Sequence, residues 1–250
     1  MDRNGENVNF VLQTKPASKC VDNFDELADL RIQIFKEFPY LYDGDIQYEK
    51  KYMGRYLDSK SAVFILVYWL NEDEFKKISE LKPNQFEFVS KNIINLFTDI
   101  DLKKMISSLS GKLVGMATAL SLSEEMPSIK NPYESYLNKH NINIENVFYF
   151  GESLLIQKYR GNGIGKLFFQ LREMAALNWN KNLQLTTFCA VDRPNDHEKK
   201  PVSYQDLSLF WNNLGYQKIP DLITSLSWKD IDCTIETDKK MIFWKKSWKV

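Results

Sequence analysis

The chain alternates between short apolar runs, which predict strands, and segments with apolar residues every three or four positions, which predict helices. The runs of strand length are 8–12, 62–70, 112–122, 147–156, 183–190, 222–228 and 240–248. Helical spacing occurs over about 22–38, 46–57, 164–175 and 204–213. Gly215 stands where a glycine commonly ends the last of these helices.

Two segments interrupt this order. Residues 71–110 are polar at first and then periodic, which predicts a helical insertion too short to have its own core. Residues 123–146 are polar, with a short helical stretch at 133–139, and a connection of this length is more often functional than idle. We therefore expect a single α/β (α+β) domain over residues 1–250.

Composition excludes several classes of protein. Lysine plus arginine and aspartate plus glutamate number 33 each, so no net charge favours a nucleic-acid or membrane partner. Three widely spaced cysteines fit reduced thiols in the cytoplasm, and no run has membrane-spanning length. The chain has only two histidines, which disfavours a histidine-based triad or a multi-histidine metal site. We therefore expect no metal.

The most informative stretch joins the strand at 147–156 to the helix that begins near Ile164. It passes through Gly161, Gly163 and Gly165. A strand that turns into a helix through glycines leaves backbone N–H groups exposed at the positive end of the helix dipole. This arrangement predicts a site for phosphate or pyrophosphate, which the glycines let the backbone approach closely.

Three anion-binding patterns compete for this loop. The P-loop pattern fails because Leu167 follows Lys166 and Arg160 stands where a glycine is required. The dinucleotide pattern fails because the glycines have the spacing Gly-x-Gly-x-Gly. The third pattern, Arg/Gln-x-x-Gly-x-Gly/Ala, fits at every position of 160–165, and it resembles the acetyl-CoA pyrophosphate loop of the GNAT (GCN5-related N-acetyltransferase) superfamily. A glycine-rich turn without a ligand is the alternative.

A second motif supports the resemblance. Residues 209–216 look like the family's segment (L/F)-Tyr-x-x-x-Gly-Phe, with Trp211 in place of the tyrosine. The order of elements is similar to the GNAT fold over nearly the whole chain. The resemblance implies a central mixed, mostly antiparallel twisted sheet of six to seven strands, flanked by helices and carrying helical insertions at 71–110 and 123–146.

The resemblance also implies an activity: transfer of an acetyl group from acetyl-CoA to a primary amine by direct attack in a ternary complex. Backbone groups of the glycine-loop strand would pair with the pantetheine arm like an added strand. The residues expected to bind acetyl-CoA are Leu154, Leu155, Ile156, Arg160, Gly161, Asn162, Gly163, Ile164, Gly165 and Lys166.

Two residues are candidates for catalysis. Glu152 shares a strand face with Leu154, and a carboxylate in a mostly apolar strand would have the raised pKa of a general base. An ion pair with an arginine in the core is the alternative interpretation of Glu152. Because the indole of Trp211 is no practical acid, Tyr204 is the candidate donor of a proton to the CoA thiolate.

The aromatic loop between the first two predicted helices lies where the family shapes its acceptor site. Tyr40, Tyr42 and Asp43 could line this site, although a turn with core aromatic residues is the plainer interpretation. Arg31 and Glu37 flank the loop and are interpreted as solvated surface. The insertions favour a small-molecule acceptor over a peptide. A protein N-acetyltransferase, a CoA-binding regulatory module without turnover, and a homodimer remain open.

Overall fold

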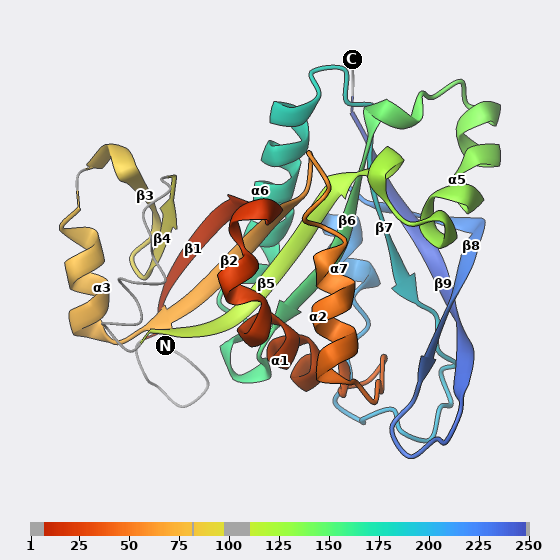
Figure 1. The fold of residues 1–250 in the computed structure, drawn as a ribbon, viewed down its shortest axis with the longest axis horizontal. Coiled ribbons are helices and arrows are strands. Elements are labelled where there is room, and N and C mark those ends of the chain that lie inside the picture. Colours follow the sequence, from red (N-terminus) through yellow and green to blue (C-terminus); the bar gives the residue numbers. More distant parts are fainter. Residues whose placement is uncertain (1–7, 82, 98–110, 249–250) are drawn as a thin grey trace.

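The computed structural model describes residues 8–81, 83–97 and 111–248, and the described residues form one nine-stranded sheet (Figure 1). The order across the sheet is β3-β4-β1-β2-β5-β6-β7-β9-β8. Two neighbouring pairs, β1–β4 and β6–β7, are parallel, and the other pairs are antiparallel. The prediction of a mixed, mostly antiparallel sheet is confirmed, but the sheet has nine strands instead of the expected six to seven.

The elements follow the predicted order with shifted ends. The strands are β1 (Asn9–Pro16), β2 (Val63–Leu70), β3 (Phe86–Ser90), β4 (Ile93–Leu96), β5 (Lys112–Ser121), β6 (Val147–Leu155), β7 (Leu185–Val191), β8 (Gln217–Lys229) and β9 (Glu236–Ser247). The α-helices are α1 (Phe24–Phe35), α2 (Ile46–Gly54), α3 (Glu72–Ser79), α5 (Pro127–Lys139), α6 (Ile164–Trp179) and α7 (Ser208–Asn213). None of the described helices is long and apolar enough to cross a membrane.

Helices cover both faces of the sheet (Figure 1). On one face, α1, α2 and α5 bury residues such as Leu27, Met53 and Tyr133 against the strands. On the other face, α6 buries Phe168 and Phe169. Apolar residues at helical spacing in α6 explain this packing, because they line the side of the helix that faces the sheet.

The first insertion differs from the prediction. Residues 71–97 contain α3 and then the hairpin β3–β4, which extends the sheet beyond β1, so the expectation of a purely helical insertion is wrong. The capping box formed by Asn71 and Glu74 starts α3. The part of the prediction that covers residues 98–110 lies outside the described residues.

The second insertion forms α5, which begins at Pro127 rather than at Tyr133. Proline suits the first position of a helix. Pro132, inside the helix, cannot donate to the carbonyl of Ser128, and the hydroxyl of Thr224 on β8 donates to that carbonyl instead, at 2.6 Å. This compensation ties α5 to the C-terminal part of the sheet.

The pairing of β6 with β7 stops after three residue pairs. The paired residues are 147–149 of β6 and 185–187 of β7. Beyond them the two strands diverge: β6 continues to pair with β5, and β7 continues to pair with β9. Among the described residues, no strand pairs with residues 150–155 of β6 on this side, and we call this stretch the open edge. It leads directly to the glycine loop at 160–166.

Candidate functional site

The glycine loop has the conformation that its sequence predicts. Gly161 and Gly163 have φ of +88° and +84°, values that residues with a Cβ rarely adopt. No atom lies within 4 Å of the Cβ position at either glycine. The N–H groups of Lys166 and Leu167 donate to the carbonyl of Gly163, which leaves the earlier N–H groups of α6 without an intrahelical acceptor. The loop therefore has the donors and the room that an anion needs.

Two side chains of the loop hold its backbone in place. Arg160 donates from Nε to the carbonyl of Leu155, at 2.9 Å, and from Nη2 to the carboxylate of Glu37, at 2.6 Å. Asn162 donates from Nδ2 to the carbonyl of Tyr159, at 3.0 Å. Both side chains face the protein, so the backbone N–H groups supply the donors that are available for an anion.

The direction of backbone groups along β6 alternates. Ile156 N–H donates to the carbonyl of Val114 on β5, so Ile156 and, by alternation, Leu154 direct their backbone groups toward β5. Leu155 and Ser153 then direct theirs toward the open edge. Of the three residues expected to bind the pantetheine arm, Leu155 is the one whose backbone faces the unpaired side.

A β-bulge in β6 sets the direction of Glu152. The register between β5 and β6 shifts between Ala117 and Ala119, opposite Gly151 and Glu152. After the bulge, Glu152 and Leu154 lie on the face covered by α1 and α2, as Tyr149 does before it. The predicted shared face of Glu152 and Leu154 is thus present.

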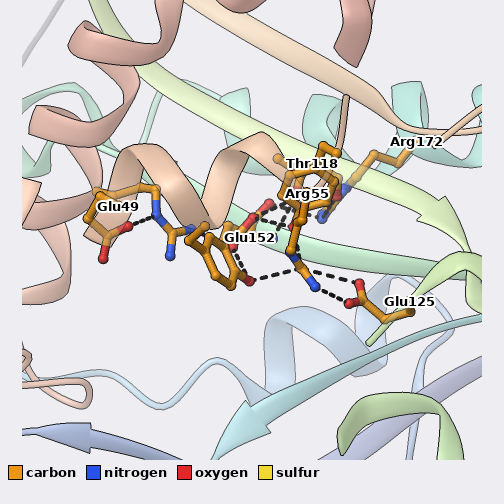
Figure 2. A network of polar contacts seen from close by, with 9 residues as sticks. Glu49, Arg55, Thr118, Glu125, Glu152 and Arg172 are labelled. Carbon is orange, nitrogen blue, oxygen red and sulfur yellow. Dashed lines mark hydrogen bonds and ion pairs between the residues drawn. The ribbon is translucent and has the colours of Figure 1, made fainter. Parts of the chain in front are cut away.

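Glu152 lies at the centre of a buried network of hydrogen bonds and ion pairs (Figure 2). Its carboxylate pairs with the guanidinium of Arg31. It also accepts hydrogen bonds from the hydroxyls of Tyr52 at 3.1 Å, Tyr56 at 3.3 Å and Thr118 at 2.5 Å. Every oxygen of this carboxylate therefore has a partner.

The network extends in two directions from Glu152 (Figure 2). Arg31 also pairs with Glu49, which is fully buried on α2. At the other end, Arg55 pairs with the buried carboxylate of Glu125 and donates to both tyrosine hydroxyls, at 2.9 Å and 2.8 Å. Three carboxylates and two guanidiniums thus alternate across the face beneath α1 and α2.

Arg172 approaches the bulge from the opposite face of the sheet. It is 1% exposed, and its Nη1 lies 3.5 Å from the carbonyl of Thr118 and 3.3 Å from that of Glu152. Its guanidinium also lies 4.4 Å from the centre of the Phe150 ring. Burial lowers the pKa of Arg172 to about 10, so the side chain remains charged at neutral pH.

Two expectations about this network are wrong. Burial of Glu152 acts to raise its pKa, but the nearby guanidiniums of Arg31 and Arg55 outweigh it and lower the pKa to about 2. Arg31 is not solvated surface, since it is 6% exposed. The carboxyl with a raised pKa is Glu125, where burial outweighs the attraction of Arg55.

The bulge leaves no room for a side chain at Gly151. A Cβ there would lie 2.4 Å from Oγ1 of Thr118, the atom that donates to Glu152. We expect Gly151→Ala to lower the free energy of unfolding by about 1–3 kcal/mol. In a Thr118→Ala background the same change should cost less, because the obstructing oxygen is absent. Urea unfolding of the double-mutant cycle measures this coupling, and additive values would contradict the close contact.

The acceptor candidates lie in different surroundings. Tyr40 is partly buried against Phe35 and Trp228. Burial raises the pKa of Tyr40, with smaller contributions from the charges of Cys189 and Glu152. The ring contacts of Tyr40 are thus with the core residues Phe35 and Trp228.

Tyr42 and Asp43 lie farther along the same loop. Burial raises the pKa of Tyr42, and the negative charge of Glu49 raises it further. Asp43 forms an ion pair with Lys229 at 2.6 Å, and this pair lowers its pKa. The carboxylate of Asp43 is half exposed and already has a cationic partner.

The loop of the acceptor candidates is fixed to the C-terminal part of the chain. Arg193 donates to the carbonyls of Pro39 and Tyr40, each at 2.9 Å, and forms a two-point ion pair with Asp230. Phe38 packs edge-to-face against the ring of Tyr204, 4.7 Å between centres. The loop at 38–43 and the loop between β7 and α7 are therefore in contact.

Tyr204 and Trp211 have different surroundings. Tyr204 precedes α7 rather than lying within the predicted helix, and burial raises its pKa. Trp211, on α7, packs against Phe188 and Trp244, each 5.0 Å away between ring centres. Trp211 thus contributes to the core behind β7 and β9.

Most of the network was not predicted from the sequence. The missed residues are Glu49, Tyr52, Tyr56, Arg55, Thr118, Glu125 and Arg172. The burial of Arg31 could have been predicted from its spacing. It stands four residues after Leu27 and three before Ile34, on the buried face of α1. Arg172 likewise lies four residues after Phe168. Within the described ranges, no group of three or more His, Cys, Asp or Glu side chains could hold a metal ion.

Comparison with known proteins gives structural matches alone. No family model and no curated sequence matches the chain. A protein of Acinetobacter baylyi ADP1 named as an acetyltransferase aligns over 97% of this chain and 94% of its own, with 10% identity and a TM-score of 0.50. NAA60 of Arabidopsis thaliana, solved with a bisubstrate analogue, aligns over 95% and 99%, with 8% identity and a TM-score of 0.49.

A GNAT-family acetyltransferase from Streptococcus pneumoniae aligns over 95% of this chain and 99% of its own, with 10% identity and a TM-score of 0.47. The match to the Acinetobacter structure extends over nearly the whole length of both chains. The chain has the fold of the GNAT acetyltransferases.

Proposed function

We propose that this protein is an N-acetyltransferase that transfers an acetyl group from acetyl-CoA to the primary amine of a small molecule. The observation that carries the proposal is the open edge of β6, which runs into the glycine loop at the start of α6. The open edge offers the backbone groups of Ser153 and the N–H of Leu155, whose carbonyl accepts from Arg160, and the loop offers N–H donors for a pyrophosphate. Acetyl-CoA, when bound, supplies the thioester.

The chain's own residues perform the remaining tasks. Backbone N–H groups of the first turn of α6 bind the pyrophosphate, and Leu155 orients the pantetheine arm along the open edge. Glu152, ionised and paired with Arg31, ties the bulge of β6 to helices α1 and α2 and so holds the strand that leads to the glycine loop in place. The proton of the attacking amine leaves through another group or through water, because a carboxylate of such low pKa is a weak base.

The small acceptor is supported by the second insertion. Helix α5 lies over β7 on the face of the network, where the hydroxyl of Tyr133 hydrogen-bonds Thr187 at 2.6 Å. The first insertion contributes nothing there in the described residues, since β3 and β4 lie at the far edge of the sheet. Both insertions were expected to enclose the acceptor, but in the described residues only α5 lies on the right face of the sheet to do so. A peptide acceptor and a CoA-binding regulatory module remain the alternatives.

The proposal is tested by calorimetric titration with acetyl-CoA, followed by thiol release with pools of amines. Binding with thiol release that depends on one pool of small amines supports the proposal. Binding with release only on peptides supports the protein N-acetyltransferase, and binding without release supports the regulatory module. Absence of binding would refute all three.

The low pKa of Glu152 makes a prediction about pH. With a pKa of about 2, Glu152 is ionised throughout the range in which the enzyme is assayed. We therefore expect wild-type protein and Glu152→Gln to share the same inflections in the profile of kcat/KM between roughly pH 5 and pH 9. Circular dichroism first confirms that the variant is folded. Loss of an inflection in Glu152→Gln would instead identify Glu152 as the base.

The role of Tyr204 has its own test. If its hydroxyl protonates the thiolate, Tyr204→Phe should lower kcat about tenfold with KM unchanged, a modest effect because a thiolate leaves readily. The matched control is Tyr136→Phe on α5, whose ring packs against His140. Equal kcat values for the wild type and Tyr204→Phe would remove Tyr204 from the mechanism.

A further inference from the structure

An open pocket lies between the glycine loop and the hairpin of the first insertion. Its volume is about 300 Å³, at the lower end of the usual range for small-molecule sites. Asn162, between the first two glycines of the loop, forms one wall. The turn of the hairpin β3–β4 forms the other wall, with Ser90, Lys91 and Asn92. The pocket therefore adjoins the site at which the loop is expected to bind an anion.

The first strand holds both walls in place. Lys91 and Asn92 are the two residues of the hairpin turn, and the carbonyl of Asn92 accepts a hydrogen bond from the N–H of Phe10 on β1, at 2.8 Å. The ring of Phe10 packs edge-to-face against that of Tyr159, whose carbonyl accepts from Asn162. The turn and the segment that leads into the glycine loop therefore contact the same residue of β1, which fixes the two walls relative to each other.

Lys91 gives the pocket its charge. It is exposed, it is the one charged side chain among the described residues that line the pocket, and it belongs to none of the ion pairs that the described residues form. The other polar side chains of the lining are a hydroxyl and two carboxamides, which can donate hydrogen bonds to phosphate oxygens. A lining of described residues with a cation and neutral donors, and without a carboxylate, favours an anion.

CoA carries an anion of the required kind beyond its pyrophosphate. The ribose bears a phosphate on its 3′ oxygen, and a phosphate monoester has a charge of roughly −1.5 to −2 at neutral pH. When the pyrophosphate is bound at the glycine loop, the ribose and its 3′-phosphate lie just outside the loop. The pocket beside Asn162 is also just outside the loop, and it offers the positive charge of Lys91.

We propose that this pocket binds the 3′-phosphate of CoA and that Lys91 is the residue that recognises it. The ammonium group pairs with the phosphate, and the ribose lies against the apolar lining formed by Val8, Phe10 and Ile93. The proposal rests on the proposed function, because it places the pyrophosphate on the glycine loop. Its consequence is a preference for CoA over 3′-dephospho-CoA, which the inserted hairpin confers.

Calorimetric titration with CoA and with 3′-dephospho-CoA tests the proposal, since the two probes differ only in the 3′-phosphate. We expect the wild type to bind CoA about tenfold more tightly at low ionic strength. The ratio should fall as salt is added, because the charges are exposed and are screened. Equal affinities would overturn this proposal and leave the transferase standing. Failure of both probes to bind would refute the proposed function and this proposal with it.

Four variants complete the experiment. Lys91→Met should bind the two probes equally, Lys91→Arg should keep the preference because it keeps the charge, and Lys91→Glu should reverse the preference because like charges repel. The matched control is Lys77→Met on α3, which removes an exposed lysine of the same insertion that does not line the pocket, and it should keep the preference.

Affinity for 3′-dephospho-CoA shows that the glycine loop is intact. It should lie within about twofold of wild type in Lys91→Met and in Lys77→Met, and circular dichroism confirms that both are folded. A tenfold preference for CoA that persists in Lys91→Met would contradict the assignment.

Discussion

Replacing Arg31 by methionine should lower the free energy of unfolding by about 3–5 kcal/mol at neutral pH. The guanidinium is almost fully buried and pairs with two carboxylates, Glu49 and Glu152. Methionine keeps much of the apolar volume but leaves both charges without their main partner. A buried carboxylate that loses its cationic partner has neither water nor an opposite charge to stabilise it. The expected loss of stability is therefore larger than that for an exposed ion pair. Guanidinium denaturation followed by circular dichroism measures it.

The effect of Arg31→Met should depend on pH. The pKa of Glu152 is lowered from 4.5 to about 2 in the folded protein, so its ionisation stabilises the fold above about pH 4.5. This contribution disappears as the pH falls from 4.5 toward 2 and the carboxylate takes up a proton. Since the variant lacks most of the contribution, the difference between the two proteins should be smaller at about pH 3 than at about pH 7.

Arg160 provides the matched control for stability. Its ion pair with Glu37 is about 40% exposed on both sides, and pairs of this kind contribute about 0–1 kcal/mol. Arg160→Met should therefore change the free energy of unfolding little. If both variants lose the same amount, the buried network does not have the importance that its geometry indicates.

Replacing Gly163 by alanine should weaken acetyl-CoA binding about 100-fold, as expected when one or two hydrogen bonds to a charged group are lost. Gly163 has a φ of +84°, and alanine there is strained whatever space is available. Relaxing that strain rotates the N–H groups that begin α6 away from the position of the anion. Calorimetry gives the affinity, and thermal unfolding confirms that the variant is folded.

Gly165 is the control within the same loop. It has no positive φ, and a Cβ there would lie 3.5 Å from the ring of Phe210, an ordinary contact. Gly165→Ala should bind acetyl-CoA within about twofold of wild type and stabilise α6 slightly. Equal losses in the two variants would show that bulk in the loop, rather than backbone conformation, controls affinity.

The sequence is sufficient to predict the regular part of the fold. Strands such as β2 and β6 are continuous apolar runs, and α6 follows a glycine turn with clear helical spacing. The hairpin β3–β4 was mistaken for helix. Its strands are only five and four residues long, and Ile93, Ile94 and Leu96 fit a helical spacing as well as a strand.

The glycine loop was predictable because its residues are adjacent in the chain. The network around Glu152 was not, because Arg31 precedes Glu152 by 121 residues and Arg55 precedes Glu125 by 70. The sequence left two interpretations of Glu152 open, a carboxylate with a raised pKa and the partner of a core arginine, and the structure shows the second. The direction of the shift depends on which cations fold against the carboxylate, and no local pattern contains that information.

The diverging β6–β7 pair also has a consequence for how the molecule resists unfolding. Three residue pairs connect the strands on the β6 side of the sheet to the strands on the β7 side. A ligand that pairs with the open edge fills the place of missing strand contacts, so it adds to the cooperativity of the whole sheet as well as occupying a site. The amide hydrogens of Ser153 and Leu155, which face the open edge, should then exchange quickly in the free protein and slowly in the complex. The lifetime of the protein against proteolysis would then rise with the concentration of the ligand bound at this edge.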